Sequence, residues 1–235
     1  MRSKFLAATA VASLAATASA DTVMMKFAGP VSGRGITVNV NGTADTVFAG
    51  LLSHQITSGT GAGASLVGSL ESYCIDVLEP LSFSEFEFDL AELTDAPVTP
   101  PPPAPPTATI NQAQADAIAR LYTAAAGAQF GSNADFNAAF QITLWEIVND
   151  FDTASSTLSL TAGDFQAGGL NTITTGFVGD LFAAATSDSI GLTPGLRALT
   201  SLTQQDQIFQ IVIPLPTTAG LAAVGLAAIG LRRRR

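Results

Sequence analysis

The two ends of the chain are apolar segments that stand outside any globular core, so folding is confined to the residues between them. At the N-terminus, Arg2 and Lys4 precede an apolar run, and Ala18-Ser19-Ala20 follows it as a small-x-small cleavage pattern. This order of charge, apolar run and cleavage pattern is typical of a secretory signal peptide. The apolar run is too short to span a bilayer. We therefore expect residues 1–20 to be a signal peptide that is removed on export.

The C-terminal end has the pattern of a membrane anchor. Residues 217–231 carry no charge, and the chain then ends on Arg232, Arg233, Arg234 and Arg235. As a helix these residues would rise about 22 Å, and the apolar residues just before them extend this length toward the ~30 Å hydrocarbon core. Terminal arginines favour the cytoplasmic side of a membrane. We expect a transmembrane helix with the body of the protein outside the inner membrane.

The body between these ends is strongly acidic. All 19 acidic residues lie between Asp21 and Asp206, and only four of the 10 basic residues lie there, which leaves the body a net charge of −15. Such a body does not bind nucleic acid by neutralising phosphates. Residues 21–213 are enough for one sizeable domain.

Residues 21–96 are expected to be rich in β-strands. Alternating or β-branched residues predict strands at 22–27, 36–40 and 46–52, and a further strand around Cys74. Residues 84–90 alternate acidic with apolar side chains, so the acids share one face. We interpret that acidic row as a solvated face rather than a cation site, because calcium ligands usually gather on a loop.

The spacing of the apolar residues changes to a helical period after a proline-rich segment. Residues 97–106 (PVTPPPPAPP) predict a stiff polyproline II linker and a subdomain boundary. Residues 107–206 form a helical part that returns to the sheet, and residues 207–213 a final strand. Apolar spacing predicts helices at 111–126, 135–149 and 171–185, the second of them buried.

The first helix carries an N-terminal signal, because Asn111 and Gln114 have the spacing of a capping box. The fold class is therefore α+β. We expect a β-rich, sandwich-like or barrel-like domain with a helical insertion, flanked by the signal peptide and the C-terminal transmembrane helix.

Cys74 is the single cysteine, which is unusual in an exported chain. It is either a small buried hydrophobe, or paired between chains, or used chemically. Gln141 and Trp145 share a face of the second helix, and a buried amide must be hydrogen-bonded. One hypothesis is that the Cys74 thiolate attacks the Gln141 carboxamide and expels ammonia, while Phe140 and Trp145 exclude water. In the alternative, Gln141 is a satisfied core amide.

Two motifs carry a resemblance to a known family. Tyr73-Cys74-Ile75-Asp76, followed by Phe140-Gln141 and Trp145 on a helix, resembles the cysteine–glutamine thioester domains of bacterial surface adhesins. The resemblance implies a Cys74–Gln141 thioester crosslink that an amine or hydroxyl of a target opens, with Trp145 as the aromatic neighbour. It covers roughly residues 66–185. The proline-rich segment between the motifs departs from that family.

The tail carries a second resemblance. Pro214-Leu215-Pro216, an apolar helix and the arginine cluster resemble the PEP-CTERM sorting signal, with Leu215 where glutamate is usual. This resemblance implies that residues 214–235 hold the precursor transiently in the inner membrane of a Gram-negative bacterium. An exosortase-like processing enzyme then cuts the chain near Pro214. The body would pass to the cell surface or extracellular matrix.

These patterns predict an adhesion or biofilm protein rather than an enzyme. The expected partner is an amine or hydroxyl on surface polysaccharide or protein. The alternative is a structural or binding protein of the matrix without covalent chemistry, and a secreted hydrolase is the third reading. We expect no cofactor and no metal site, since one histidine and one cysteine make a poor zinc site. His54, in a Gly/Ser/Thr-rich stretch, is expected to be exposed and passive.

Overall fold

The computed structural model describes residues 21–98, 108–126, 128, 131–151 and 154–211. The predicted signal peptide, most of the proline-rich linker and the sorting motif with its helix and arginine cluster lie outside these residues. Within the described residues, no helix is both long enough and apolar enough to cross a membrane.

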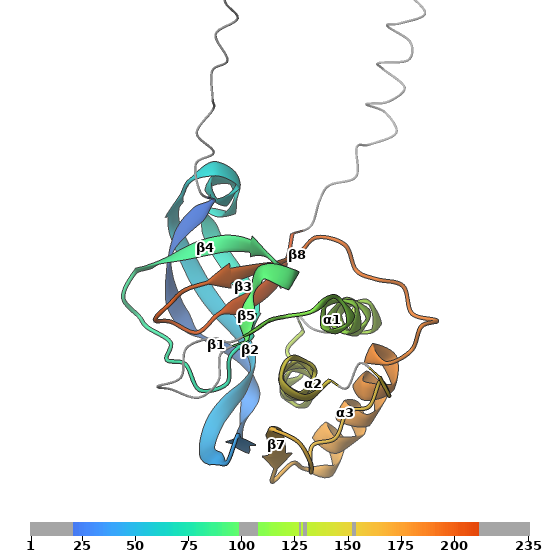
Figure 1. Ribbon diagram of the computed structural model, residues 1–235. Coiled ribbons are helices and arrows are strands. Elements are labelled where there is room, and N and C mark those ends of the chain that lie inside the picture. The colour runs from blue at the N-terminus through green and yellow to red at the C-terminus, as the bar shows by residue number, and fades with distance from the viewer. Residues whose placement is uncertain (1–20, 99–107, 127, 129–130, 152–153, 212–235) are drawn as a thin grey trace, which may run out of the picture.

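The described part is an α+β fold built on one large antiparallel sheet (Figure 1). Its strands are β1 (Thr22–Val40), β2 (Thr43–Gly59), β3 (Gly68–Cys74), β4 (Phe86–Glu92), β7 (Phe165–Gly168), β8 (Leu196–Thr200) and β9 (Gln207–Gln210). A separate two-stranded pair joins β5 (Pro97–Val98) to β6 (Ala108–Thr109). The helices are α1 (Gln112–Ala124), α2 (Ala134–Asp150) and α3 (Thr172–Ala185), with short 3-10 turns η1 (Gly61–Leu66) and η2 (Leu93–Asp95).

The sheet runs in the order β2-β3-β9-β8-β4-β1-β7, and β2 also pairs with β1. This extra pairing closes the circuit of strands from β1 through β2, β3, β9, β8 and β4 back to β1. Strands β1 to β4, before the proline-rich segment, and strands β7 to β9, after it, therefore belong to the same sheet. The three helices gather on one side of the strands (Figure 1).

The first two strands are longer than the sequence predicted. β1 merges two expected strands and pairs with β2 almost along its whole length, with register shifts near Gly29 and Pro30. Gly33 and Gly50 face each other in this pairing, and a Cβ on Gly33 would lie 2.2 Å from the Ala49 carbonyl oxygen. Gly33 lies between two predicted strands and Gly50 within the third, and both glycines allow the two backbones to approach closely.

The three predicted helices are confirmed. Asn111 caps α1 in a capping box with Gln114, as expected. Every residue of α2 from Asn137 to Val148 is buried, which explains why its sequence is apolar on most sides. α2 packs against the other two helices and against β1 and β2, so it forms the centre of the main core.

Candidate functional site

Cys74 is the last residue of β3, where the strand meets β9. Its backbone pairs with Gln207, and Tyr73 pairs with Ile208. Only 3% of the cysteine is exposed. The strand position expected from the sequence is confirmed.

Gln141 is brought from α2 into direct contact with Cys74. Its side-chain Oε1 accepts a hydrogen bond from the Cys74 backbone N–H (2.9 Å), and its Nε2 donates to the Cys74 carbonyl (2.8 Å). The amide is fully buried. These two bonds satisfy the backbone of Cys74 at the end of β3, where the ladder to β9 stops. The two residues that the sequence singled out, 67 positions apart, therefore meet.

The sulfur itself contacts a second glutamine. The Cys74 thiol donates to Oε1 of Gln205 (2.9 Å), and Nε2 of Gln205 donates to the Asp76 carbonyl. Burial raises the pKa of the Cys74 thiol far above its ordinary value, so the thiol is protonated at neutral pH. Sequence reasoning missed Gln205. The polar run Gln204-Gln205-Asp206-Gln207 at the start of the final strand was the available signal.

A cavity of about 370 Å³ opens beside the thiol. Its walls are mostly apolar, with Glu79 and Gln205 as the polar members. Trp145, the predicted aromatic neighbour, and Cys74 both line this cavity. The full lining is Phe27, Pro30, Val47, Phe48, Leu52, Cys74, Val77, Glu79, Leu81, Trp145 and Gln205. A molecule entering this space would meet the sulfur in largely apolar surroundings.

Phe140 lies deeper than this cavity. Its ring packs on Tyr73 with 4.4 Å between ring centroids, and edge-on against Tyr122 at 5.0 Å. It is fully buried and is not among the residues that line the cavity. Phe140 therefore supports the residue before Cys74, while Trp145 lines the cavity together with Phe27 and Phe48.

The expectation that His54 is exposed is wrong. His54 is 1% exposed, and burial lowers its pKa to about 4, so the ring is neutral. Leu52, His54 and Ile56 are spaced two apart on β2 and are all buried. This period-2 pattern was readable in the sequence and outweighs the polar composition of the stretch. His54 lines a different, smaller pocket and not the Cys74 cavity.

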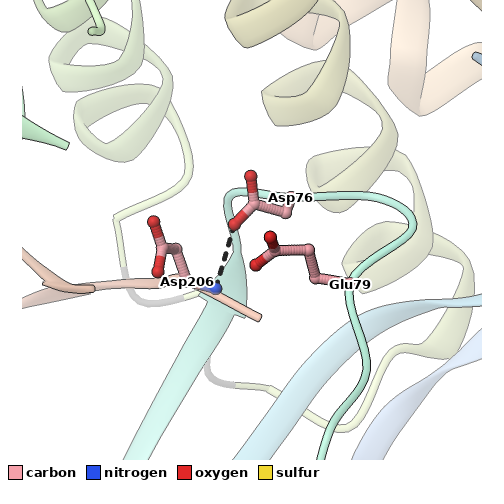
Figure 2. Close-up of side chains that lie close together, drawn as sticks. All are labelled: Asp76, Glu79 and Asp206. Atoms are coloured by element: carbon pink, nitrogen blue, oxygen red, sulfur yellow. Dashed lines mark hydrogen bonds between the residues drawn. The ribbon is translucent and has the colours of Figure 1, made fainter. Parts of the chain in front are cut away.

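Three carboxylates gather next to the cysteine, on the loop after β3 and just before β9 (Figure 2). One carboxylate oxygen from each of Asp76, Glu79 and Asp206 lies within 4.8 Å of the other two. Asp76 Oδ2 also accepts from the backbone N–H of Asp206 (3.0 Å). Among the described residues, this is the cluster with ligand atoms close enough together for a metal ion.

The acidic row of β4 is separate from this cluster. Glu85, Glu87 and Asp89 are exposed and Phe88 is buried, so the expected solvated face is confirmed.

No protein-family model, no curated protein and no solved structure matches this chain.

Proposed function

We propose that the chain is an exported cell-surface or matrix protein whose body forms a Cys74–Gln141 thioester and uses it for covalent attachment. The observation that carries the proposal is the contact between the buried Gln141 carboxamide and the backbone of Cys74. A glutamine and a lone cysteine from distant parts of the chain share one enclosed site. Proximity of this kind replaces a bimolecular encounter with an intramolecular one.

The chemistry balances without an external reagent. The Cys74 sulfur bonds to the side-chain carbonyl carbon of Gln141, the C–N bond breaks, and the thiol proton leaves with ammonia. To reach the sulfur, the Gln141 amide turns away from the Cys74 backbone and gives up its two hydrogen bonds. Before the reaction, the Cys74 thiol donates a hydrogen bond to Gln205, which orients the sulfur.

The attachment step uses the same two residues. A target amine or hydroxyl on surface protein or polysaccharide enters the cavity beside Cys74 and attacks the acyl carbon of Gln141. The C–S bond breaks, a C–N or C–O bond forms, and the thiol is restored. Trp145 and the apolar walls limit the access of water, which would otherwise hydrolyse the thioester. Each chain reacts once, so the protein is not a turnover enzyme.

Labelling with methylamine tests this reaction. We expect one methylamine per wild-type chain, incorporated at Gln141 by peptide mapping, and none in Cys74→Ala or Gln141→Ala. Gln112→Ala is the matched control, because it removes an exposed glutamine on α1, leaves the proposed acyl donor in place and should label as the wild type does. Incorporation at Gln205 instead, or equal labelling of Cys74→Ala, would contradict the proposal.

Sorting through the C-terminal segment is the second part of the proposal, and the sequence of residues 214–235 supports it. Deleting these residues should release the body into the periplasm or medium, because the membrane anchor is gone. Cell fractionation with an antibody to the body measures this. A deleted chain that stays with the membrane would show that the anchor lies elsewhere.

A non-covalent matrix protein is the second candidate. The Gln141 amide is hydrogen-bonded to the Cys74 backbone, and the Cys74 thiol is hydrogen-bonded to Gln205. These polar groups therefore have partners without any covalent reaction. In that function the motif pair stabilises the junction of α2 with β3 and nothing more. Cys74→Ser that retains surface adhesion would favour it.

A further inference from the structure

The carboxylates of Asp76, Glu79 and Asp206 lie close together at the edge of the core. Asp206 is fully buried and Asp76 is 4% exposed, while Glu79 is partly exposed. Three potential negative charges therefore converge within 4.8 Å at the edge of the core. Charged groups in such a setting need a hydrogen-bonding or ionic partner.

Two oxygens of these three carboxylates have no hydrogen-bond partner among the described residues. Asp206 accepts a bond from the Ser201 N–H at Oδ1 (2.7 Å), but its buried Oδ2 has no hydrogen-bond partner. Glu79 Oε2 is also buried without a partner. A fully buried carboxylate with an unused oxygen is costly unless something binds that oxygen. The unused oxygens are an observation separate from the clustering of acids.

The basic side chains that the structure describes do not supply the missing partner. Within the described residues the basic side chains are Lys26, Arg34, Arg120 and Arg197, and the three arginines form ion pairs with acids outside the cluster. Lys26 forms no ion pair with the cluster. Among these residues, the unused oxygens of Asp206 and Glu79 therefore remain available to a bound cation.

We propose that Asp76, Glu79 and Asp206 bind one divalent cation of the calcium class. Hard carboxylate oxygens are the ligands that calcium prefers, and oxygens on opposite sides of a calcium ion are about 4.6–5.2 Å apart, which the cluster accommodates. The partly exposed Glu79 provides the route in from solvent. This site departs from the expectation, drawn from the sequence, that the chain holds no metal. It does not depend on the thioester.

The cation would fix the surroundings of the cysteine. Asp76 and Glu79 belong to the segment after β3, and Asp206 to the segment before β9. These segments already meet through Ile75 N–H to the Asp206 carbonyl (2.8 Å) and Gln205 N–H to the Pro80 carbonyl (3.0 Å). Gln205, which holds the sulfur, lies between them. A cation joining the two segments would therefore stabilise the loop that positions the Cys74 thiol.

Calorimetric titration of the chelator-stripped full-length chain with calcium chloride tests the site. We expect one calcium per wild-type chain, binding roughly tenfold or more weakened in Glu79→Gln, and no binding in Asp206→Asn. Glu87→Gln is the matched control, because Glu87 is an exposed acid on β4 outside the cluster. It should bind as the wild type does, which separates a specific site from general attraction to an acidic body.

Thermal unfolding provides a second, independent measurement of calcium binding by the wild type and the variants. Calcium should raise the Tm of the wild type and of Glu87→Gln but leave that of Asp206→Asn unchanged. A wild type that binds no calcium, or an Asp206→Asn variant that binds it equally well, would overturn the site.

Discussion

Glu146 is the residue whose surroundings most directly predict a pH effect on stability. It follows Trp145 on α2, is 1% exposed, and accepts the Ser159 N–H at Oε1 while Oε2 has no partner among the described residues. Burial raises its pKa from 4.5 to about 7. Between these values the folded state holds a proton that the unfolded state releases, so the free energy of unfolding falls as pH rises through this window.

Glu146→Gln should therefore reduce the loss of stability between pH values near 5 and 8. The expected difference is on the order of 2 kcal/mol, set by the size of the pKa shift. Urea unfolding at a series of pH values measures it, and Glu85→Gln, at an exposed position, controls for the loss of one negative charge. Asp206 acts in the same direction, so the slope should diminish without vanishing. An unchanged slope in Glu146→Gln would refute this role.

Residue-level prediction from the sequence worked where one local pattern decided the outcome. The burial of Gln141 followed from its place on an apolar helix. Its partner did not, because the bonds go to the backbone of Cys74 across 67 residues, and no local pattern encodes that register. The contact of Gln205 with the sulfur and the convergence of Asp76 with Asp206 are unpredictable for the same reason.

At the scale of elements, the start of α1 gives a clear prediction. The Asn111 side chain accepts the Gln114 N–H (3.0 Å), and Gln114 Oε1 accepts the Asn111 N–H (2.9 Å). Gln114 also donates to the carbonyls of Ile147 and Val148 near the end of α2. The cap thus satisfies free backbone groups at the start of one helix and near the end of another.

Asn111→Ala should lower the free energy of unfolding by about 1 kcal/mol, because it leaves the Gln114 N–H without its acceptor. Chemical denaturation measures this, and the m-value should stay constant. Asn111→Ser retains a capping oxygen and should remain close to the wild type. Equal destabilisation by both substitutions would show that the cap is not the cause.

Helices were predicted better than strands. The three helices lie within two residues of their predicted bounds, because caps and 3.6-residue spacing are local signals. β7 and β8 were missed, since four or five residues give too little alternation to read. Gly29, Pro30 and Gly33 suggested breaks in β1, yet register shifts and a close backbone approach keep that strand continuous.

On the scale of the whole molecule, the residues that flank 99–107 are paired with each other. Pro97 and Val98 pair with Thr109 and Ala108, so the chain on the two sides of 99–107 lies side by side. The strands of the main sheet come from both sides of it. The change of composition was visible in the sequence. The return of β8 and β9 to a place between β3 and β4 depends on long-range pairing that composition does not encode.

The enclosed meeting of Cys74 and Gln141 is the claim on which the proposed attachment rests. Intact mass of the untreated body, combined with alkylation of the unfolded protein before and after amine treatment, is its most direct test. A thioester predicts a mass lower than the sequence mass by one ammonia and a thiol that does not alkylate until the bond is opened by an amine. A body of full sequence mass, carrying a thiol that alkylates on unfolding without prior amine treatment, would contradict it.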